Sequence, residues 1–214
     1  MRGKIALFIS HPYCSTDSAN GIIQALEPDY RFKIFGHYGV EDDFFDDVDI
    51  VAVPGGIGDA SSYKRLFREN SKPIRRFMDD GGRYLGICMG AYWAAHHYLN
   101  ILDGVKASQY ITRPATCTKR PHAKAMPITW NGQEQDMYFY DGPAFHAKDP
   151  NFETVATYPN GDAMAIYQGK IGLIGCHPES TPHWYTQQKY MNEHWHNYKH
   201  HKLLRKFVDE LMER

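Results

Sequence analysis

Strand-length hydrophobic runs and longer amphipathic stretches alternate along the first ninety residues. Apolar or alternating runs of strand length lie at residues 4–10, 30–35, 49–53 and 84–87. Apolar residues three and four positions apart predict helices over residues 61–70 and 71–80, and another after the Ser-Thr-Asp-Ser cluster at 15–18. Strands and helices in this order, joined by short connections, predict a parallel sheet with right-handed crossovers.

The pattern changes in the second half of the chain. Between residues 105 and 170, polar and apolar residues alternate, and Asn-Gly and Asp-Gly pairs separate the runs, which predicts antiparallel or mixed strands that extend the sheet. Aromatic and histidine residues crowd the segment 181–201, and residues 203–212 carry an apolar stripe at helical spacing. We therefore expect a three-layer α/β sandwich with a mainly parallel central sheet, antiparallel extensions and a closing C-terminal helix.

Composition narrows the class of protein. The 214 residues fit one domain of ordinary α/β size, and a net charge of −1 gives no electrostatic reason to expect nucleic acid or a membrane surface as partner. The longest apolar run, Ile5–Ile9, is far shorter than the roughly 20 residues of a membrane span. Four scattered cysteines form neither a disulfide framework nor a C-x-x-C motif. A cytoplasmic protein is expected.

Cys88 lies between a strand-like run and a helix-forming run. Gly86 and Gly90 flank it two residues away on either side, the spacing that a sharp strand-to-helix turn requires around a nucleophile. Such an elbow lifts the side chain from the sheet edge and places the sulfur at a helix N-terminus, which favours the thiolate. The pattern predicts a nucleophile elbow at Cys88, although a buried cysteine at a tight turn would have the same local sequence.

Two further stretches supply the other groups that a thiol nucleophile needs. Residues 51–56 predict a strand that runs into a glycine pair, where the N–H of Gly56 could bind an oxyanion beside the N–H of Met89. Residues 172–179 predict a strand that ends in His177 and Glu179, a base and the carboxylate that orients it.

In this order, the three stretches resemble the class I glutamine amidotransferase superfamily, and more closely the amidotransferase-like domain at the N-terminus of some biotin–protein ligases. The resemblance spans about residues 4–180 and rests on Pro54–Gly56, residues 81–92, Tyr140–Phe145 and His177–Glu179. It implies a single amidotransferase-like domain over residues 1–214 with a flavodoxin-like fold.

The resemblance also implies a catalytic triad of Cys88, His177 and Glu179. The expected function is that of a stand-alone cysteine-dependent hydrolase acting on an amide or related acyl substrate, with a ligase or synthetase as a possible partner. One alternative is a non-catalytic binding or regulatory domain of the biotin–protein ligase N-terminal type. A second alternative is the chaperone-like or protease branch of cysteine-elbow proteins, which usually has histidine where this chain has Met89.

The expected substrate site combines glycine backbone with aromatic side chains. Gly55, Tyr92, Tyr140 and Trp184 are the candidate substrate-binding residues. Tyr92 stands where working glutamine amidotransferases commonly have a polar residue such as glutamine or histidine, and its hydroxyl does not reproduce the paired donor and acceptor of an amide. A larger amide or ester is therefore expected in place of free glutamine. No cofactor and no metal are expected, because His196 and His200 share a helix face without a third ligand at zinc-like spacing.

Overall fold

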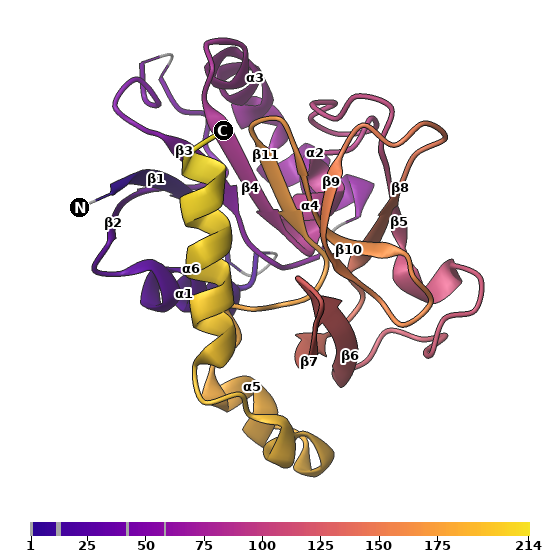
Figure 1. The fold of residues 1–214 in the computed structure, drawn as a ribbon. Helices are drawn as coiled ribbons and strands as arrows, with labels where there is room; N and C mark the ends of the chain where they lie inside the picture. The colour runs from indigo at the N-terminus through magenta and orange to yellow at the C-terminus, as the bar shows by residue number, and fades with distance from the viewer. Residues whose placement is uncertain (1, 12–13, 42, 58) are drawn as a thin grey trace.

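The computed structural model describes residues 2–11, 14–41, 43–57 and 59–214. Its eleven-stranded sheet has the order β2-β1-β3-β4-β11-β10-β9-β6-β7, with β8 paired to β10 and β5 paired to β8 (Figure 1). The strands are β1 (Gly3–Phe8), β2 (Tyr30–Phe35), β3 (Ile50–Val53), β4 (Arg83–Ile87), β5 (Lys106–Gln109), β6 (Lys124–Trp130), β7 (Gln133–Phe139), β8 (Pro143–His146), β9 (Glu153–Thr157), β10 (Ala163–Gln168) and β11 (Ile171–Ile174). The helices are α1 (Thr16–Leu26), α2 (Ala60–Leu66), α3 (Ser71–Asp79), α4 (Met89–Trp93), α5 (Pro182–Thr186) and α6 (Lys199–Met212), with 3₁₀ helices η1 (Arg68–Asn70), η2 (Tyr110–Thr112) and η3 (Lys189–His194).

The sheet has a parallel half and an antiparallel half. Strands β2, β1, β3, β4 and β11 run parallel to one another. Strands β10, β9, β6, β7, β8 and β5 pair antiparallel. The predicted parallel sheet with antiparallel extensions is confirmed. Because parallel strands end at one edge, the residues that follow β3, β4 and β11 converge there.

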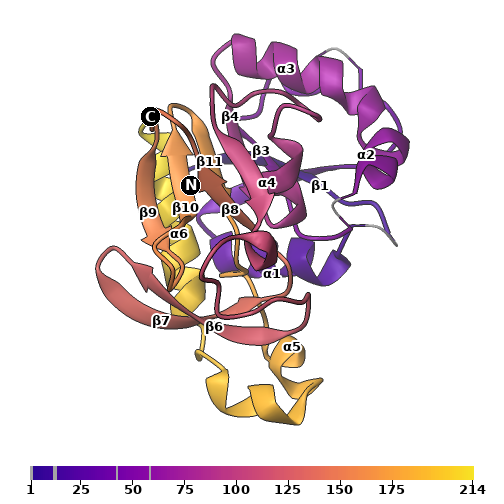
Figure 2. The same ribbon diagram turned by 90° about the vertical axis from the view of Figure 1, so that its right-hand side faces the viewer.

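Helices cover both faces of the parallel half, as Figure 2 shows. One core lies between the sheet and helices α1 and α6, and it includes Ile22, Leu85 and Phe207. The other core lies under α2, α3 and α4, where Phe67 and Trp93 pack with ring centroids 5.1 Å apart. The three-layer arrangement expected from the sequence is therefore present.

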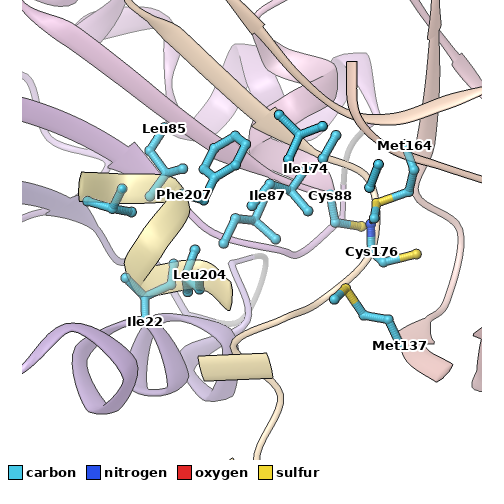
Figure 3. Packing of buried hydrophobic residues seen from close by; sticks show 14 of the residues in the cluster. Ile22, Leu85, Ile87, Cys88, Met137, Met164, Ile174, Cys176, Leu204 and Phe207 are labelled. Carbon is cyan, nitrogen blue, oxygen red and sulfur yellow. The ribbon is translucent and has the colours of Figure 1, made fainter. Parts of the chain in front are cut away.

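Helix α6 closes the first core. Its buried side chains Leu204 and Phe207 meet the sheet beside Ile87 and Ile174 (Figure 3), and Leu211 belongs to the same core. The approach is close, because a Cβ on Gly172 of β11 would lie 2.7 Å from Cε1 of Phe207. The amphipathic stripe at the end of the chain thus covers the end of the sheet's parallel half.

Two helices differ from the sequence-based expectation. The stretch expected as one helix over residues 61–70 ends its α-helix at Leu66 and continues as η1. The helix after Cys88 is only five residues long, because the chain turns between Ala94 and Asn100 with bonds such as Leu99 N–H to Trp93 O at 2.9 Å. Within the described ranges, no helix combines the length and hydrophobicity that crossing a membrane demands.

Candidate active site

Cys88 occupies a strained turn between β4 and α4. Its φ of 48° and ψ of −100° lie outside the conformations that residues with a Cβ normally adopt. A Cβ on Gly90 would lie 2.0 Å from the carbonyl oxygen of Val53, and one on Gly86 would lie 2.6 Å from the carbonyl oxygen of Gly90. The turn therefore leaves no room for side chains at either glycine, which is the physical reason for the spacing seen in the sequence.

His177 and Glu179 follow β11 at the same edge of the sheet. Nδ1 of His177 lies 2.8 Å from Oε1 of Glu179, and both side chains are buried. The backbone N–H of His177 donates to the carbonyl oxygen of Tyr138 at 2.8 Å. The Glu179 carboxylate thus holds the imidazole of His177, and the bond to Tyr138 holds its backbone. Nε2 of the imidazole remains available for a second partner.

Cys88 provides that partner. Burial alone would lower the pKa of His177, but the negative charges of Glu179 and the Cys88 thiolate, with hydrogen bonds to both, raise it to about 10. The geometry brings together the three side chains that the sequence singled out, although 89 residues separate Cys88 from His177. The raised pKa favours the protonated form of His177 at neutral pH.

Ser18 joins this group and was not anticipated from the sequence. Its hydroxyl donates to Oε1 of Glu179 at 2.6 Å and accepts from the N–H of Gly55 at 2.9 Å. Ser18 is fully buried in the first turn of α1, where its own N–H donates to the hydroxyl of Ser15 at 3.1 Å. Its only sequence signal was the helix-capping cluster at residues 15–18, which says nothing of a contact with a carboxylate 161 residues away.

The glycine pair after β3 lies against α4 and His177. The N–H of Gly90 donates to the carbonyl oxygen of Pro54 at 3.1 Å, which ties the loop to the first turn of α4. A Cβ on Gly55 would lie 2.6 Å from Cε1 of His177, so this glycine allows the imidazole to approach the backbone. Gly56 forms an antiparallel bridge with Cys14. The candidate oxyanion donors Gly56 and Met89 thus belong to two segments that are bonded to each other.

Aromatic side chains surround the imidazole. The ring of Trp184 lies 5.0 Å from that of His177, and the ring of Tyr138 lies 5.9 Å away in an edge-to-face arrangement. Burial raises the pKa of Tyr92, the Cys88 charge raises it further, and the Tyr92 hydroxyl donates to the carbonyl oxygen of Asp141 at 3.0 Å. Tyr140, the residue chosen from the sequence, is 53% exposed. Tyr138 was not singled out from the sequence, where the resemblance pointed to the segment that begins at Tyr140.

Two of the histidines of segment 181–201 form a buried stack. The rings of His196 and His200 lie 4.0 Å apart, and burial together with neighbouring histidine charges lowers the pKa of His196 to about 3 and of His200 to about 4. Nε2 of His201 lies 3.0 Å from the carbonyl oxygen of Ser180. Among the described residues, no group of three or more His, Cys, Asp or Glu side chains has metal-binding geometry.

The chain resembles known proteins in sequence and in structure. Residues 13–103 match the family described as biotin-protein ligase, N terminal. Pyridoxal 5'-phosphate synthase subunit PdxT of Corynebacterium glutamicum (strain R) is 23% identical over 157 residues, which cover 69% of this chain and 78% of that protein.

Solved structures resemble the whole chain. A glutamine amidotransferase from Thermotoga maritima superposes with a TM-score of 0.68 at 12% identity, covering 100% of both chains. PurLQS from Thermotoga maritima superposes with a TM-score of 0.61 at 13% identity, covering 99% of this chain and 100% of the other. The predicted resemblance to the class I glutamine amidotransferase-like superfamily is confirmed, and the fold is of that flavodoxin-like type.

Proposed function

We propose that the chain is a cysteine-dependent hydrolase of amidotransferase type, with Cys88 as nucleophile, His177 as acid and base, and Glu179 as the group that orients the imidazole. The observation that carries the proposal is the buried contact of 2.8 Å between Nδ1 of His177 and Oε1 of Glu179, at the sheet edge where β4 ends in the strained turn at Cys88. The amidotransferase-type fold and the similarity to PdxT support a function of this general class.

The reaction follows from these contacts. The Cys88 thiolate attacks the carbonyl carbon of an amide, and the oxyanion that forms accepts hydrogen bonds from the N–H groups of Gly56 and Met89. The His177 imidazolium then gives its proton to the departing amine, which leaves a thioester on Cys88. Water attacks the thioester while neutral His177 takes a proton from it. Collapse of the resulting oxyanion breaks the C–S bond, which releases the acid and restores the Cys88 thiolate and the His177 imidazolium.

The other buried cysteines are poorly suited to attack a carbonyl. Burial raises the pKa of Cys14 to about 12, and burial likewise raises the pKa of Cys176. Both thiols therefore stay protonated at neutral pH, and neither faces the imidazolium that stabilises a thiolate. This contrast supports Cys88 as the reactive thiol.

The aromatic side chains support an acyl substrate larger than glutamine. Trp184 and Tyr138 stand against His177, and Tyr92 lies on the Cys88 side. Tyr140 at the end of β7 and Gly55 beside the imidazole complete the candidate substrate-binding residues. Flat apolar walls of this kind bury the apolar part of a ligand and leave its polar end to a few donors.

A protein partner is a further part of the proposal. PdxT is named as a subunit of a synthase, and this chain shares its general fold. Ile57 and Tyr140 are 50% and 53% exposed and follow the glycine loop and β7. A ligase or synthetase that receives the released amine or acid could cover such exposed apolar side chains.

The test is a screen of glutamine, γ-glutamyl compounds and larger amides for release of ammonia or amine. Wild type, Cys88→Ala and the matched control Cys176→Ala are compared. We expect turnover of a larger amide in wild type and the control, and its loss in Cys88→Ala. Efficient turnover of free glutamine would overturn the substrate class but not the nucleophile. Ligand binding without turnover in every variant would replace the hydrolase by the non-catalytic binding domain.

A further inference from the structure

A cationic stretch of the chain plays no part in the proposed reaction. Residues 64–76 contain six lysine and arginine residues and one acid, Glu69, in a protein whose net charge is −1. The stretch runs through α2, η1 and α3, on the face of the sheet opposite α6 (Figure 2). Because the net charge of the chain is close to zero, acidic residues elsewhere in the chain balance the excess of cations in this stretch. The positive potential is therefore concentrated on the face that carries α2, η1 and α3.

The structure arranges four of these cations around one hollow, here called the basic cavity. It has a volume of about 340 Å³, and its charged lining consists of Lys64, Arg68, Lys72 and Arg75, with His97 beside them. No carboxylate is among its lining residues. A concave surface with charges of one sign focuses the field more than a flat surface does.

Hydroxyl groups and aromatic rings also line the basic cavity. The hydroxyl groups of Tyr63 and Ser71 lie 2.8 Å apart, and both residues are buried. The rings of Tyr63 and Tyr98 meet edge to face, with centroids 5.0 Å apart. A ligand in the cavity would therefore find fixed hydroxyl groups and aromatic surface beneath the ring of charges.

No acid in the part of the chain that the structure describes forms an ion pair with Lys64, Arg68, Lys72 or Arg75. Nη1 of Arg75 donates to the carbonyl oxygen of Leu99 at 3.1 Å, a bond that orients the guanidinium but leaves its charge unpaired. Asp59, the N-cap residue of α2, accepts a hydrogen bond from the N–H of Ser62 at 2.7 Å and does not line the cavity.

We propose that the basic cavity binds a small, multiply charged anion whose charged groups are phosphates or carboxylates. Four like charges around one hollow repel one another, and an anion seated among them removes that repulsion while it gains charge-assisted hydrogen bonds. The volume lies near the lower end of the roughly 300–1,000 Å³ of small-molecule sites. None of Cys88, His177 and Glu179 lines the cavity, so the site is separate from the proposed reaction.

Calorimetric titration of the whole chain with pyrophosphate and with citrate tests the proposal and separates the two anion chemistries. We expect saturable one-to-one binding of at least one of them. The double variant Arg68→Gln/Lys72→Gln should bind about fivefold or more weakly, since it removes two of the four charges and the charge-assisted hydrogen bonds that they donate. These side chains are exposed, so the substitutions leave the core intact.

The matched control is Lys189→Gln/Lys202→Gln, which removes the same charge from η3 and α6 at the other side of the molecule (Figure 1). It should bind the anion as wild type does. Equal weakening in both double variants would show a general charge effect and overturn the site. So would the absence of saturable binding by either anion, or binding of long polyanions such as poly-glutamate without binding of the small ones.

Discussion

Replacing Ser18 by alanine tests the contact network behind the imidazole. The substitution removes the hydroxyl that donates to Glu179 at 2.6 Å and accepts from the N–H of Gly55 at 2.9 Å. Hydrogen bonds to a charged group contribute about 1.5–3 kcal/mol, and a buried N–H left without acceptor costs about 1–3 kcal/mol. Because the two effects overlap, we expect Ser18→Ala to lower the free energy of unfolding by about 2–4 kcal/mol.

The same change should alter the reactivity of Cys88. Glu179 holds the His177 imidazole at 2.8 Å, and it loses the donor from α1 that fixes its own position. If about 1.4 kcal/mol of the stabilisation of the imidazolium is lost, the pH profile of Cys88 alkylation moves up by about one unit. Alkylation by iodoacetamide, followed by mass spectrometry at several pH values, measures the shift without requiring a substrate.

Ser62→Ala is the matched control. Ser62 is also buried in the first turn of a helix, α2, where its N–H is capped by Asp59 at 2.7 Å, but it contacts neither Glu179 nor Gly55. Its loss should cost about 1 kcal/mol or less and leave the alkylation profile unchanged. If Ser18→Ala and Ser62→Ala behave alike in urea unfolding and in alkylation, Ser18 does not position the carboxylate.

Two further predictions concern a glycine and a buried histidine. Gly90→Ala should prevent stable folding, because its Cβ would lie 2.0 Å from the carbonyl oxygen of Val53, and the cooperative urea transition should be lost. The control Gly39→Ala should fold normally, because the nearest atom to its Cβ would lie 3.5 Å away. Burial and the nearby His201 lower the pKa of His200 to about 4. Between about pH 6.5 and pH 4, His200 therefore binds a proton in the unfolded chain but stays neutral in the folded chain. Stability should therefore fall as the pH drops from about 6.5 to about 4, by up to about 1.4 kcal/mol per unit, and urea midpoints should show a smaller fall in His200→Phe.

The sequence predicted the fold because its hydrophobic periods are strong. A short run of β-branched and apolar residues such as Ile50–Val53, followed by a Pro-Gly-Gly turn signal, is typical of a buried strand, and the alternation after residue 105 distinguishes the antiparallel half from the parallel half. The spacing of Gly86, Cys88 and Gly90 predicted a sharp turn. The close approach of the Gly90 carbonyl group to Gly86 is local, whereas the approach of Val53 to Gly90 is a tertiary contact.

Contacts between distant segments could not be predicted in this way. The bond from Ser18 to Glu179 depends on how α1 packs beneath the end of β11, and no local pattern contains that information. The short length of α4 has a similar origin, since the residues after Trp93 favour a helix by themselves and turn away only in the tertiary structure. The contact of Tyr138 with His177 has the same origin, because it joins β7 to the segment after β11.

The excursion from Thr181 to His196 returns to the place from which it leaves. The hydroxyl of Ser180 lies 3.3 Å from Nε2 of His196, and its carbonyl oxygen lies 3.0 Å from Nε2 of His201. A loop whose two ends are already fastened together adds little ordering entropy when its length or composition changes. The length or composition of the segment that carries Trp184 can therefore change at a low entropic cost, while Glu179, which precedes Ser180, keeps its place.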